Sequence, residues 1–320
     1  MNTIAIVTGC AGFIGSHLCE ALLKDSRRVF GIDNLDDYYD GWIKRANLTL
    51  LRKYDRFRFV PADILRAPAA LYQNADTVFH MAARPGVRIS IGRGELYIRN
   101  NVLGTQVVLN RATEAGVGTF VVASSSSVYG NIPVPFAEDG PTEPISPYGA
   151  SKLAAEAMCR THVLANPVSI TSLRFFCVYG PRCRPDLVLS KFAKKIDAGK
   201  PIPVYGDPKA ISRDYTYIDD IVQGILKAEA FTQGSKGRHT VVNLGNGKPI
   251  RLDEAIETIA DAVGKKPVYD QQPANPADAQ TTHACTKAAE SLLDWRATTD
   301  YADGVARYIE WFRENQAVAP

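Results

Sequence analysis

The feature that most constrains this chain is the alternation of short apolar runs with amphipathic helical stretches in its first half. The runs are rich in β-branched residues and continuously apolar, which is typical of strands buried on both faces of a parallel sheet. The runs lie at 4–7, 29–32, 57–60, 77–80, 119–123 and 169–176, and the helical stretches at about 13–24, 95–115 and 147–165. The pattern predicts an α/β fold, a doubly wound parallel sheet.

After about residue 177, glycine and proline interrupt the sequence more often and the elements become shorter. We predict helices at 186–198, 218–230, 251–263 and 302–316, and a strand at 241–244, with 273–278 as the most loop-like stretch. The frequent glycines and prolines and the short elements predict a smaller, mixed α/β C-terminal domain. The predicted division is a first domain of 1–177 plus about 215–245, and a second of 178–214 and 246–320.

Composition excludes several classes of function. Lys and Arg total 37 against 34 Asp and Glu, a net charge of +3, with no charged run. A nucleic-acid or membrane-surface binder needs a concentrated positive face, and a membrane helix needs about 20 apolar residues. The N-terminus reads as a strand, not a signal peptide. The six cysteines lack C-x-x-C spacing and the histidines lack ligand spacing, so we expect reduced thiols, no metal site and a cytoplasmic protein.

A glycine-rich loop follows the first predicted strand and opens a helix. Residues 9–15 read Gly-Cys-Ala-Gly-Phe-Ile-Gly. Gly9 is expected to take the tight turn, and Gly12 to let backbone N–H groups approach a pyrophosphate at the positive end of the helix. Gly15 is expected to let helix and strand pack closely. The loop therefore predicts a Rossmann-type dinucleotide site.

Acidic residues follow the next two predicted strands. Asp33-Asn34 ends the second, where a carboxylate accepts hydrogen bonds from ribose hydroxyls and repels a 2′-phosphate. No arginine directly follows, so NAD is favoured over NADP. The alternative for Asp33 is a turn-forming residue. Asp63-Ile64 follows the third strand and is predicted to flank the adenine, although a helix N-cap explains Asp63 nearly as well.

A tyrosine and a lysine stand four residues apart on the helix predicted at 147–165. Tyr148 and Lys152 therefore share one face. A free phenol, with a pKa near ~10, is a poor base at neutral pH, but a nearby cation favours the phenolate. Ser125, at the end of the fifth predicted strand, is positioned to bond the same substrate oxygen. Together these residues predict proton transfer beside a dinucleotide.

These features resemble the extended short-chain dehydrogenase/reductases, specifically the nucleotide-sugar epimerases, across nearly the whole chain. Within that family the chain most resembles the UDP-glucuronate 4-epimerases. The matching segments are the glycine loop, Ser125 with Tyr148 and Lys152, the stretch 33–39 (DNLDDYY), 85–88 (PGVR), 124–130 (SSSSVYG), 174–186 (RFFCVYGPRCRPD) and Arg213-Asp214-Tyr215.

The resemblance implies tightly bound, recycled NAD in the first domain and a UDP-sugar in the second. Tyr148 as phenolate would take the proton of the sugar 4-hydroxyl while hydride passes from C4 to NAD⁺; the 4-keto sugar then turns and is reduced on its other face. Lys152 would bond the nicotinamide ribose and keep Tyr148 ionised, and Ser125 would relay the proton. The implied cofactor residues are Gly9, Gly12, Phe13, Ile14, Gly15, Asp33, Asn34, Asp63, Ile64, Ala82, Asn101, Tyr148 and Lys152.

With UDP-glucuronate the implied intermediate is a β-keto acid, which loses CO₂ unless donors hold its carboxylate out of line. Ser126, Ser127 and Arg184 or Arg88 are the expected donors, with strand-end turn chemistry as the alternative for the serines. Relatives often have Thr where this chain has Cys177, a weaker donor. The implied substrate residues are Pro85, Gly86, Arg88, Ser125, Ser126, Ser127, Phe176, Cys177, Arg184, Tyr205, Arg213 and Asp278.

The UDP half needs a diphosphate clamp. Arg213 matches the family's pyrophosphate arginine, with a surface ion pair to Asp214 or Asp219 as the alternative. Tyr205 is expected beside the uridine, or else in the core. Galactose-type epimerases carry a second arginine where this chain reads Asn-Pro-Ala-Asp at 275–278, which favours the glucuronate branch and leaves Asp278 for the ribose.

Rival interpretations remain at this stage. A UDP-glucose or UDP-N-acetylhexosamine 4-epimerase stays open. Dehydratases need Asp-Glu, and decarboxylases typically carry Glu, where this chain has Ser126-Ser127. A non-catalytic dinucleotide-binding regulator usually lacks the Tyr or the Lys. The resemblance also implies a homodimer through the helices at 95–115 and 147–165.

Overall fold

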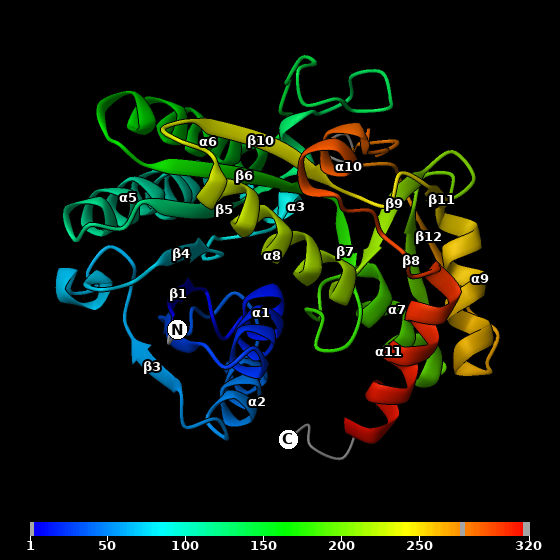
Figure 1. The fold of residues 1–320 in the computed structure, drawn as a ribbon. Coiled ribbons are helices and arrows are strands. Elements are labelled where there is room, and N and C mark those ends of the chain that lie inside the picture. The colour runs from blue at the N-terminus through cyan, green and yellow to red at the C-terminus, as the bar shows by residue number, and fades with distance from the viewer. Residues whose placement is uncertain (1–2, 276–278, 316–320) are drawn as a thin grey trace.

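A seven-stranded parallel sheet forms the centre of the molecule. The computed structural model describes residues 3–275 and 279–315 (Figure 1). The strand order is β10-β6-β5-β4-β1-β2-β3, and every pair is parallel. The strands are β1 (Ile4–Thr8), β2 (Arg28–Asp33), β3 (Phe57–Pro61), β4 (Thr77–His80), β5 (Thr119–Ser125), β6 (Ser169–Phe175) and β10 (His239–Leu244). The predicted doubly wound α/β fold is confirmed.

Helices cover both faces of this sheet. One layer is formed by α1 (Phe13–Lys24), α2 (Gly41–Leu51) and α8 (Ile218–Gly234), and the other by α5 (Gly104–Glu114) and α6 (Pro147–Ala165). Ser146 caps α6 by accepting a hydrogen bond from the Gly149 N–H, and Pro147 occupies its first turn. The prediction for 147–165 is confirmed residue by residue.

The helix predicted at 95–115 is divided into three pieces. A short α4 (Gly94–Tyr97) leads into a π-helical segment (Ile98–Leu103) and then α5. An extra residue in a helical turn shifts the face that each side chain presents, and such bulges occur often beside functional sites. The segment with the bulge brings Asn101 against the backbone of Arg84, just after β4. A helical pattern alone does not indicate this contact.

The second half adds two small sheets and four helices on one side of the molecule. One sheet joins β11 (Pro249–Arg251), β9 (Ser212–Tyr217) and β7 (Cys177–Tyr179), and the other β12 (Tyr269–Gln272) and β8 (Ile202–Tyr205). The helices are α7 (Val188–Asp197), α9 (Leu252–Val263), α10 (Lys287–Leu293) and α11 (Tyr301–Asn315). The strands β7, β8, β9, β11 and β12, and the helices α2 and α10, were not predicted, because short strands with polar residues carry little periodic signal.

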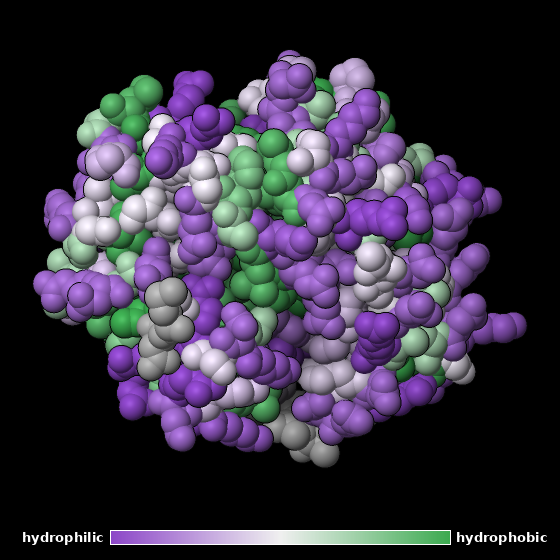
Figure 2. Space-filling view, in the orientation of Figure 1, coloured by the Kyte–Doolittle hydropathy of each residue, from purple (hydrophilic) through white to green (hydrophobic). Residues whose placement is uncertain are grey.

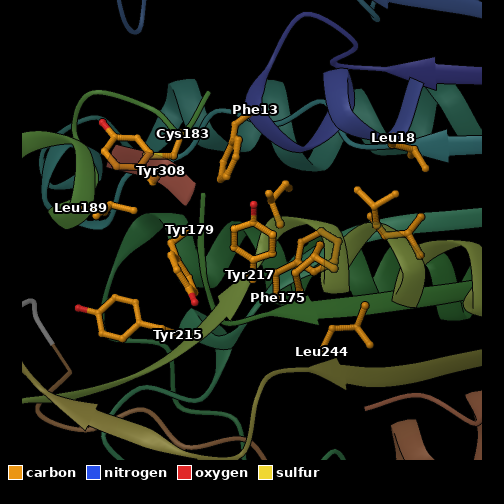
Figure 3. Packing of buried hydrophobic residues seen from close by; sticks show 14 of the residues in the cluster. Phe13, Leu18, Phe175, Tyr179, Cys183, Leu189, Tyr215, Tyr217, Leu244 and Tyr308 are labelled. Carbon is orange, nitrogen blue, oxygen red and sulfur yellow. The ribbon is translucent and has the colours of Figure 1, made fainter. Parts of the chain in front are cut away.

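The large sheet and the small sheets share one hydrophobic cluster. Phe13 at the start of α1 lies close to Phe175 and Tyr217, which come from β6 and β9 (Figure 3). The same cluster continues to Ile256 of α9 and Tyr308 of α11. The start of the glycine-loop helix is therefore packed directly on the second half of the chain. The predicted domain boundaries stay a prediction.

Within the described residues, no helix is long and apolar enough to cross a membrane. The same residues hold no group of His, Cys, Asp or Glu side chains with the arrangement of a metal site. All six cysteines are free thiols.

Candidate active site

A pocket opens at the carboxyl ends of the central strands. In an open α/β sheet, ligands bind where the strand order reverses, and this sheet reverses between β1 and β4. The pocket wall includes the glycine loop after β1, Asp33 after β2 and the Met81–Pro85 segment after β4. Tyr148, Lys152 and Arg184 complete it from α6 and the β7–α7 loop.

The glycine loop has the geometry that its sequence predicts. Gly9 adopts φ +71°, and a Cβ there would lie 2.8 Å from the Ala82 backbone nitrogen. A Cβ on Gly15 would lie 2.1 Å from the Gly9 carbonyl oxygen, so only glycine permits this approach of helix to strand. Gly12 is the N-cap of α1 without a side-chain cap. The first turn of α1, with Phe13 and Ile14, therefore presents its backbone N–H groups to the pocket.

Asp33 lies at the end of β2 with its side chain only 8% exposed. Its carboxylate accepts hydrogen bonds from the N–H groups of Ala11 (3.1 Å) and Leu35 (2.8 Å). Burial raises the Asp33 pKa, while the charge of Lys44 and the two N–H donors lower it. Asp33 thus ties the glycine loop to the β2 end, and it also lines the pocket.

The remaining predicted adenosine residues make local hydrogen bonds. Asn34 accepts a bond from the Asp36 N–H, and Asp63 accepts one from the Leu65 N–H at 2.9 Å. Asp63 therefore caps a turn rather than a regular helix. Asn34, Asp63 and Ile64 all line the pocket.

Ala82 belongs to the segment after β4, and Asn101 contacts that segment through Arg84. The Ala82 N–H donates to the Thr8 hydroxyl at 3.1 Å, and Ala82 lines the pocket. Asn101 is buried, and its side-chain amide bonds both backbone groups of Arg84 and the Ser151 hydroxyl. It is Asn100, not Asn101, that lines the pocket. Asn101 therefore contributes by fixing the Arg84 backbone against α6.

Ser125 and Tyr148 are brought together, as their sequence positions predict. Ser125 ends β5, and its hydroxyl accepts a bond from the Ser127 N–H at 3.1 Å. Burial raises the pKa of the Tyr148 phenol, while a hydrogen bond with Ser125 and the charge of Arg184 lower it. Gly149 permits this approach, because a Cβ there would lie 2.4 Å from the Ser127 carbonyl oxygen.

Lys152 lines the pocket, and its ammonium is bound at the carboxyl end of β5. Its Nζ donates to the Ala123 carbonyl oxygen at 2.7 Å. Burial lowers the Lys152 pKa to about 8, while the charge of Glu156 raises it. In this structure, the cation whose charge lowers the Tyr148 pKa is Arg184, whereas the resemblance implied Lys152 in that role.

Arg184 comes from the β7–α7 loop and is held by Asp186 of the same loop and by Tyr38 from the segment after β2. Its Nε and Nη2 each bond Asp186 at 2.9 Å, and its guanidinium lies 5.7 Å from the centre of the Tyr38 ring. Tyr38 donates to Asp186 at 3.2 Å. Gly86, at φ +101°, makes room for Tyr38, because a Cβ there would lie 2.3 Å from its hydroxyl. The result is an arginine fixed in the same pocket wall as Tyr148 of α6.

Arg88 and Tyr205 lie together although they are far apart in sequence. The Arg88 guanidinium stacks 3.9 Å from the centre of the Tyr205 ring. Arg88 is in a short helix, α3 (Val87–Ser90), and Tyr205 ends β8. Just before α3, the Pro85 carbonyl oxygen accepts a bond from the Tyr97 hydroxyl at 2.6 Å. Tyr205 is half-buried and lies outside the core clusters, and neither Tyr205 nor Arg88 is among the residues that line the pocket.

Arg213 does not pair with Asp214. Its Nη1 donates to the carbonyl oxygens of Ser212 (2.8 Å) and Gln280 (3.0 Å). The Asp214 side chain is fully buried, and its carboxylate accepts three backbone N–H bonds, from Asn246, Gly247 and Ala284. The ion pair with Asp214, the alternative that the sequence left open, is therefore wrong.

The other predicted sugar contacts lie in different environments, some in the core and some near the end of β5. Phe176 is buried in a small aromatic cluster with Tyr129 and Phe136, so its side chain belongs to the core. Cys177 is half-buried in β7, where burial raises its pKa to about 11 and the charge of Arg213 lowers it. Ser126 and Ser127 form a short 3₁₀ turn after Ser125. Asp278 lies outside the described residues.

Sequence reasoning missed several polar residues in or behind the pocket wall. Arg84 binds Asp36 through both carboxylate oxygens, at 2.6 and 2.8 Å. Lys44 of α2 is buried and donates to the Asp36 carbonyl oxygen. On α6 itself, Glu156 is four residues after Lys152, and this helical spacing is the signal that would have found it.

The fold and the site define a class: a Rossmann-type dinucleotide-binding protein with a Ser–Tyr pair, a buried lysine and a half-buried arginine at the carboxyl end of its sheet. Residues 5–245 match the model of the "NAD dependent epimerase/dehydratase family". The chain belongs to this family.

Two curated relatives and one solved structure are similar over nearly the whole chain. The UDP-glucuronate 4-epimerase of Thermodesulfobacterium geofontis is 37% identical, with 97% of this chain and 96% of the relative covered. UDP-glucuronate 4-epimerase 6 of Arabidopsis thaliana is 38% identical, with 98% and 72% covered. The structure of the UDP-glucuronic acid 4-epimerase from Bacillus cereus, in complex with UDP-glucuronic acid and NAD, superimposes with a TM-score of 0.93 at 34% identity, covering 98% of this chain and 99% of that one.

Proposed function

We propose that this protein is an NAD-dependent 4-epimerase of a UDP-sugar, and that it converts UDP-glucuronate to UDP-galacturonate. The observation that carries the proposal is Tyr148, hydrogen-bonded to Ser125, in the same pocket wall as Lys152, Arg184 and the uncapped N-terminus of α1. Relatives that bear this activity cover almost the entire chain.

The pocket wall fits a dinucleotide. The N-terminus of α1 has no side-chain cap, and Gly9 and Gly15 leave no room for a Cβ, which suits a pyrophosphate at the helix end. Asp33 is placed for the adenosine ribose, where its negative charge disfavours a 2′-phosphate. When bound, NAD supplies an acceptor for the sugar hydride and a donor to return it.

Tyr148 exchanges a proton with the sugar 4-hydroxyl: as phenolate it takes the proton when the sugar is oxidised, and as phenol it returns the proton when the 4-keto sugar is reduced. Burial raises the pKa of Tyr148, and its hydrogen bond with Ser125 and the charge of Arg184 oppose this rise by favouring the phenolate. Ser125 orients the same sugar oxygen. Lys152, fixed by the Ala123 carbonyl, is placed to bond the cofactor ribose and adds positive charge to this wall.

Arg184 supports a uronate over a neutral hexose. Its Nε and Nη2 are held by Asp186, so the guanidinium is fixed before substrate arrives, with Nη1 left to meet a carboxylate. A fixed donor restrains the carboxylate beside the 4-ketone, which limits the loss of CO₂. Cys177 favours the second candidate, a 4-epimerase of UDP-glucose or a UDP-N-acetylhexosamine, because a thiol is a weak donor to a carboxylate.

For the UDP half, Arg213 and the Arg88–Tyr205 stack are the proposed contacts. Arg213 is fixed by two backbone carbonyls and not by a carboxylate, so its charge is not neutralised by Asp214 and suits a diphosphate. Tyr205 offers an aromatic face for the uracil. Asp278 remains a predicted ribose contact.

The test is to incubate the protein separately with UDP-glucuronate, UDP-glucose and UDP-N-acetylglucosamine, and to identify the products by NMR. UDP-galacturonate from the first substrate alone is the expected result. Turnover of a neutral substrate in preference would favour the second candidate. Bound NAD without turnover of any of the three would instead indicate a non-catalytic regulator.

We also propose a homodimer through α5 and α6. Three large apolar side chains in or beside these helices are exposed: Leu164 (83%), Ile98 (60%) and Leu103 (50%). Figure 2 shows a mostly hydrophilic face with apolar side chains gathered where these helices end, at the upper left, and in a narrow central band. Sedimentation of wild-type protein and a Leu164→Glu, Ile98→Glu variant tests this, with a monomeric variant expected. The cytoplasmic location stays a prediction.

A further inference from the structure

A buried ion pair lies behind the pocket wall, and the proposed chemistry leaves it without a role. Arg174 of β6 binds Glu156 of α6 through both carboxylate oxygens, at 3.0 and 2.8 Å. The two side chains are 5% and 6% exposed. Burying two charges costs more solvation energy than a simple pair recovers, unless further hydrogen bonds satisfy them. Here such bonds are present: Ser124 donates to Glu156, and Arg174 donates to the Tyr129 hydroxyl at 2.8 Å and to the Glu138 carbonyl oxygen at 3.3 Å. The pair is therefore fixed in place as well as buried.

The ion pair is connected to the site by one helix face and one strand end. Glu156 follows Lys152 by one turn and Tyr148 by two, so all three share a face of α6. Ser124, which lines the pocket beside Lys152, donates its hydroxyl hydrogen to Glu156. Glu156 thus touches the same strand end whose Ala123 carbonyl holds the Lys152 ammonium.

The Lys152 ammonium is short of compensating charge. A carbonyl dipole is its hydrogen-bond partner, and the side chain is buried. A buried ammonium tends to lose its proton, because the charged form is the one that desolvation penalises. The nearby carboxylate of Glu156 opposes that loss.

We propose that Glu156 is a positioning residue that keeps Lys152 protonated in the pocket wall, with Arg174 limiting the size of this effect. The consequence for catalysis rests on the proposed function, in which Lys152 holds the cofactor ribose and supports Tyr148. The charge state of Lys152 itself does not depend on which sugar the protein accepts.

Of the groups around this centre, Glu156 and Cys159 are the two whose negative charge raises the Lys152 pKa. Burial and the charge of Lys152 lower the pKa of His80 to about 3, and burial lowers that of His239 to about 4, so both are neutral near pH 7. Burial raises the Cys159 pKa to about 12, so the thiol is neutral as well. The titratable and charged groups facing the centre are Tyr148, Cys159 and Arg160 of α6, His80 of β4, Arg174 of β6, His239 of β10, and Tyr129 and Glu138 beside Arg174.

The experiment is an NMR titration of the full-length protein carrying ¹³Cε-labelled lysine, with Lys152→Arg used to assign the signal. Glu156→Gln removes the carboxylate and leaves Arg174 unpaired, so the Lys152 pKa is expected to fall by about one unit or more. Arg174→Gln leaves Glu156 without its own partner, so the Lys152 pKa is expected to rise. Opposite shifts from two residues of one ion pair are the signature of the proposal.

Two kinds of control separate charge from packing. Glu156→Asp and Arg174→Lys keep the charges and are expected to leave the Lys152 pKa near its wild-type value. The double variant Glu156→Gln, Arg174→Gln removes both charges and is expected to bring the pKa most of the way back. The double variant also replaces a broken buried pair with a neutral one, so it remains usable if a single variant fails to fold.

Equal shifts in the same direction for both charge-removing variants, or no shift in either, would overturn the proposal. The pH profile of kcat gives a second readout, and its alkaline limb is expected to move in the direction of the Lys152 pKa in each variant. Because the titration needs no turnover, it also stands if the substrate assays refute the epimerase activity.

Discussion

The dinucleotide end of the pocket is held mainly by backbone atoms, whereas Arg184 at the sugar end is held by other side chains. Asp33 bonds the N–H groups of Ala11 and Leu35, and the glycine loop is set by contacts of Gly9 and Gly15. Arg184 instead depends on Asp186 and on Tyr38, which lies nearly 150 positions earlier in the chain. The dinucleotide end is kept rigid by its local backbone geometry. At the sugar end, a change of one side chain can alter the position of Arg184.

This difference explains how one fold can accept different sugars. A backbone cradle for a pyrophosphate tolerates few changes, because a single Cβ meets main-chain atoms. Arginines held by side chains can be re-aimed by changing one partner. The four predictions that follow test whether the two ends really differ in this way.

The largest expected effect is at the junction of the two ends. Tyr148→Phe removes only the phenolic oxygen, so it should lower kcat by about 10²- to 10⁴-fold or more while NAD content stays near wild type. Steady-state rates and the cofactor released on denaturation measure the two effects. Tyr269→Phe, at an exposed position in β12, is the matched control. Turnover near the wild-type rate would rule out Tyr148 as the base.

At the backbone-held end, Gly15→Ala should disrupt the structure itself. The new Cβ would lie 2.1 Å from the Gly9 carbonyl oxygen, and such overpacking costs about 1–3 kcal/mol or more of unfolding free energy. Urea unfolding and NAD content measure the loss. Gly118→Ala is the control, since no atom lies within 4 Å of its Cβ position. Equal stability of the two variants would contradict a rigid dinucleotide end.

At the sugar end, Arg184→His should change the outcome of the reaction while the fold is kept. Losing a fixed charge-assisted donor is expected to lower kcat/KM for UDP-glucuronate by about 10- to 100-fold. The share of product released as CO₂ should rise, because the carboxylate is less restrained. Trapping of ¹⁴CO₂ measures it, with the exposed Arg58→His as control. If CO₂ stays at the wild-type level while turnover persists, the role given to Arg184 is wrong.

The smallest expected effect is at Cys177. A hydroxyl is a stronger hydrogen-bond donor than a thiol, so Cys177→Thr should raise the preference for UDP-glucuronate over UDP-glucose by roughly 2- to 5-fold. The ratio of the two kcat/KM values measures it. Cys285→Thr, at another half-buried free thiol, should leave the ratio unchanged. A shift toward UDP-glucose would show that Cys177 does not help to hold a carboxylate.

Much of the sheet and of the dinucleotide end could be predicted, because both rest on local patterns. The runs at 4–7 and 29–32 became β1 and β2, and the helices at 13–24 and 147–165 begin and end where predicted. The division of 95–115 by a π-helical segment could not be predicted, because one extra residue barely changes a helical pattern.

The sugar end was predicted only as a set of candidates. Arg184, Arg88 and Arg213 were named from resemblance, but their partners were not: Asp186 and Tyr38 for the first, Tyr205 for the second, and two backbone carbonyls for the third. Phe176 was expected at the sugar and is in the core. Except for Asp186 and Ser212, which are close in sequence to their arginines, these partners come from distant segments, and no periodicity in the sequence indicates them.

The sequence by itself determined the alternation of strands and helices in the central sheet, the glycine loop and the shared face of Tyr148 and Lys152, since each follows from spacing along the backbone. Only the tertiary structure placed Arg184 in the same pocket wall as Tyr148, and a buried Glu156–Arg174 pair behind Lys152. The reason is physical: the effect of a charge depends on its distance through space and on its burial. Neither quantity is set by separation along the chain.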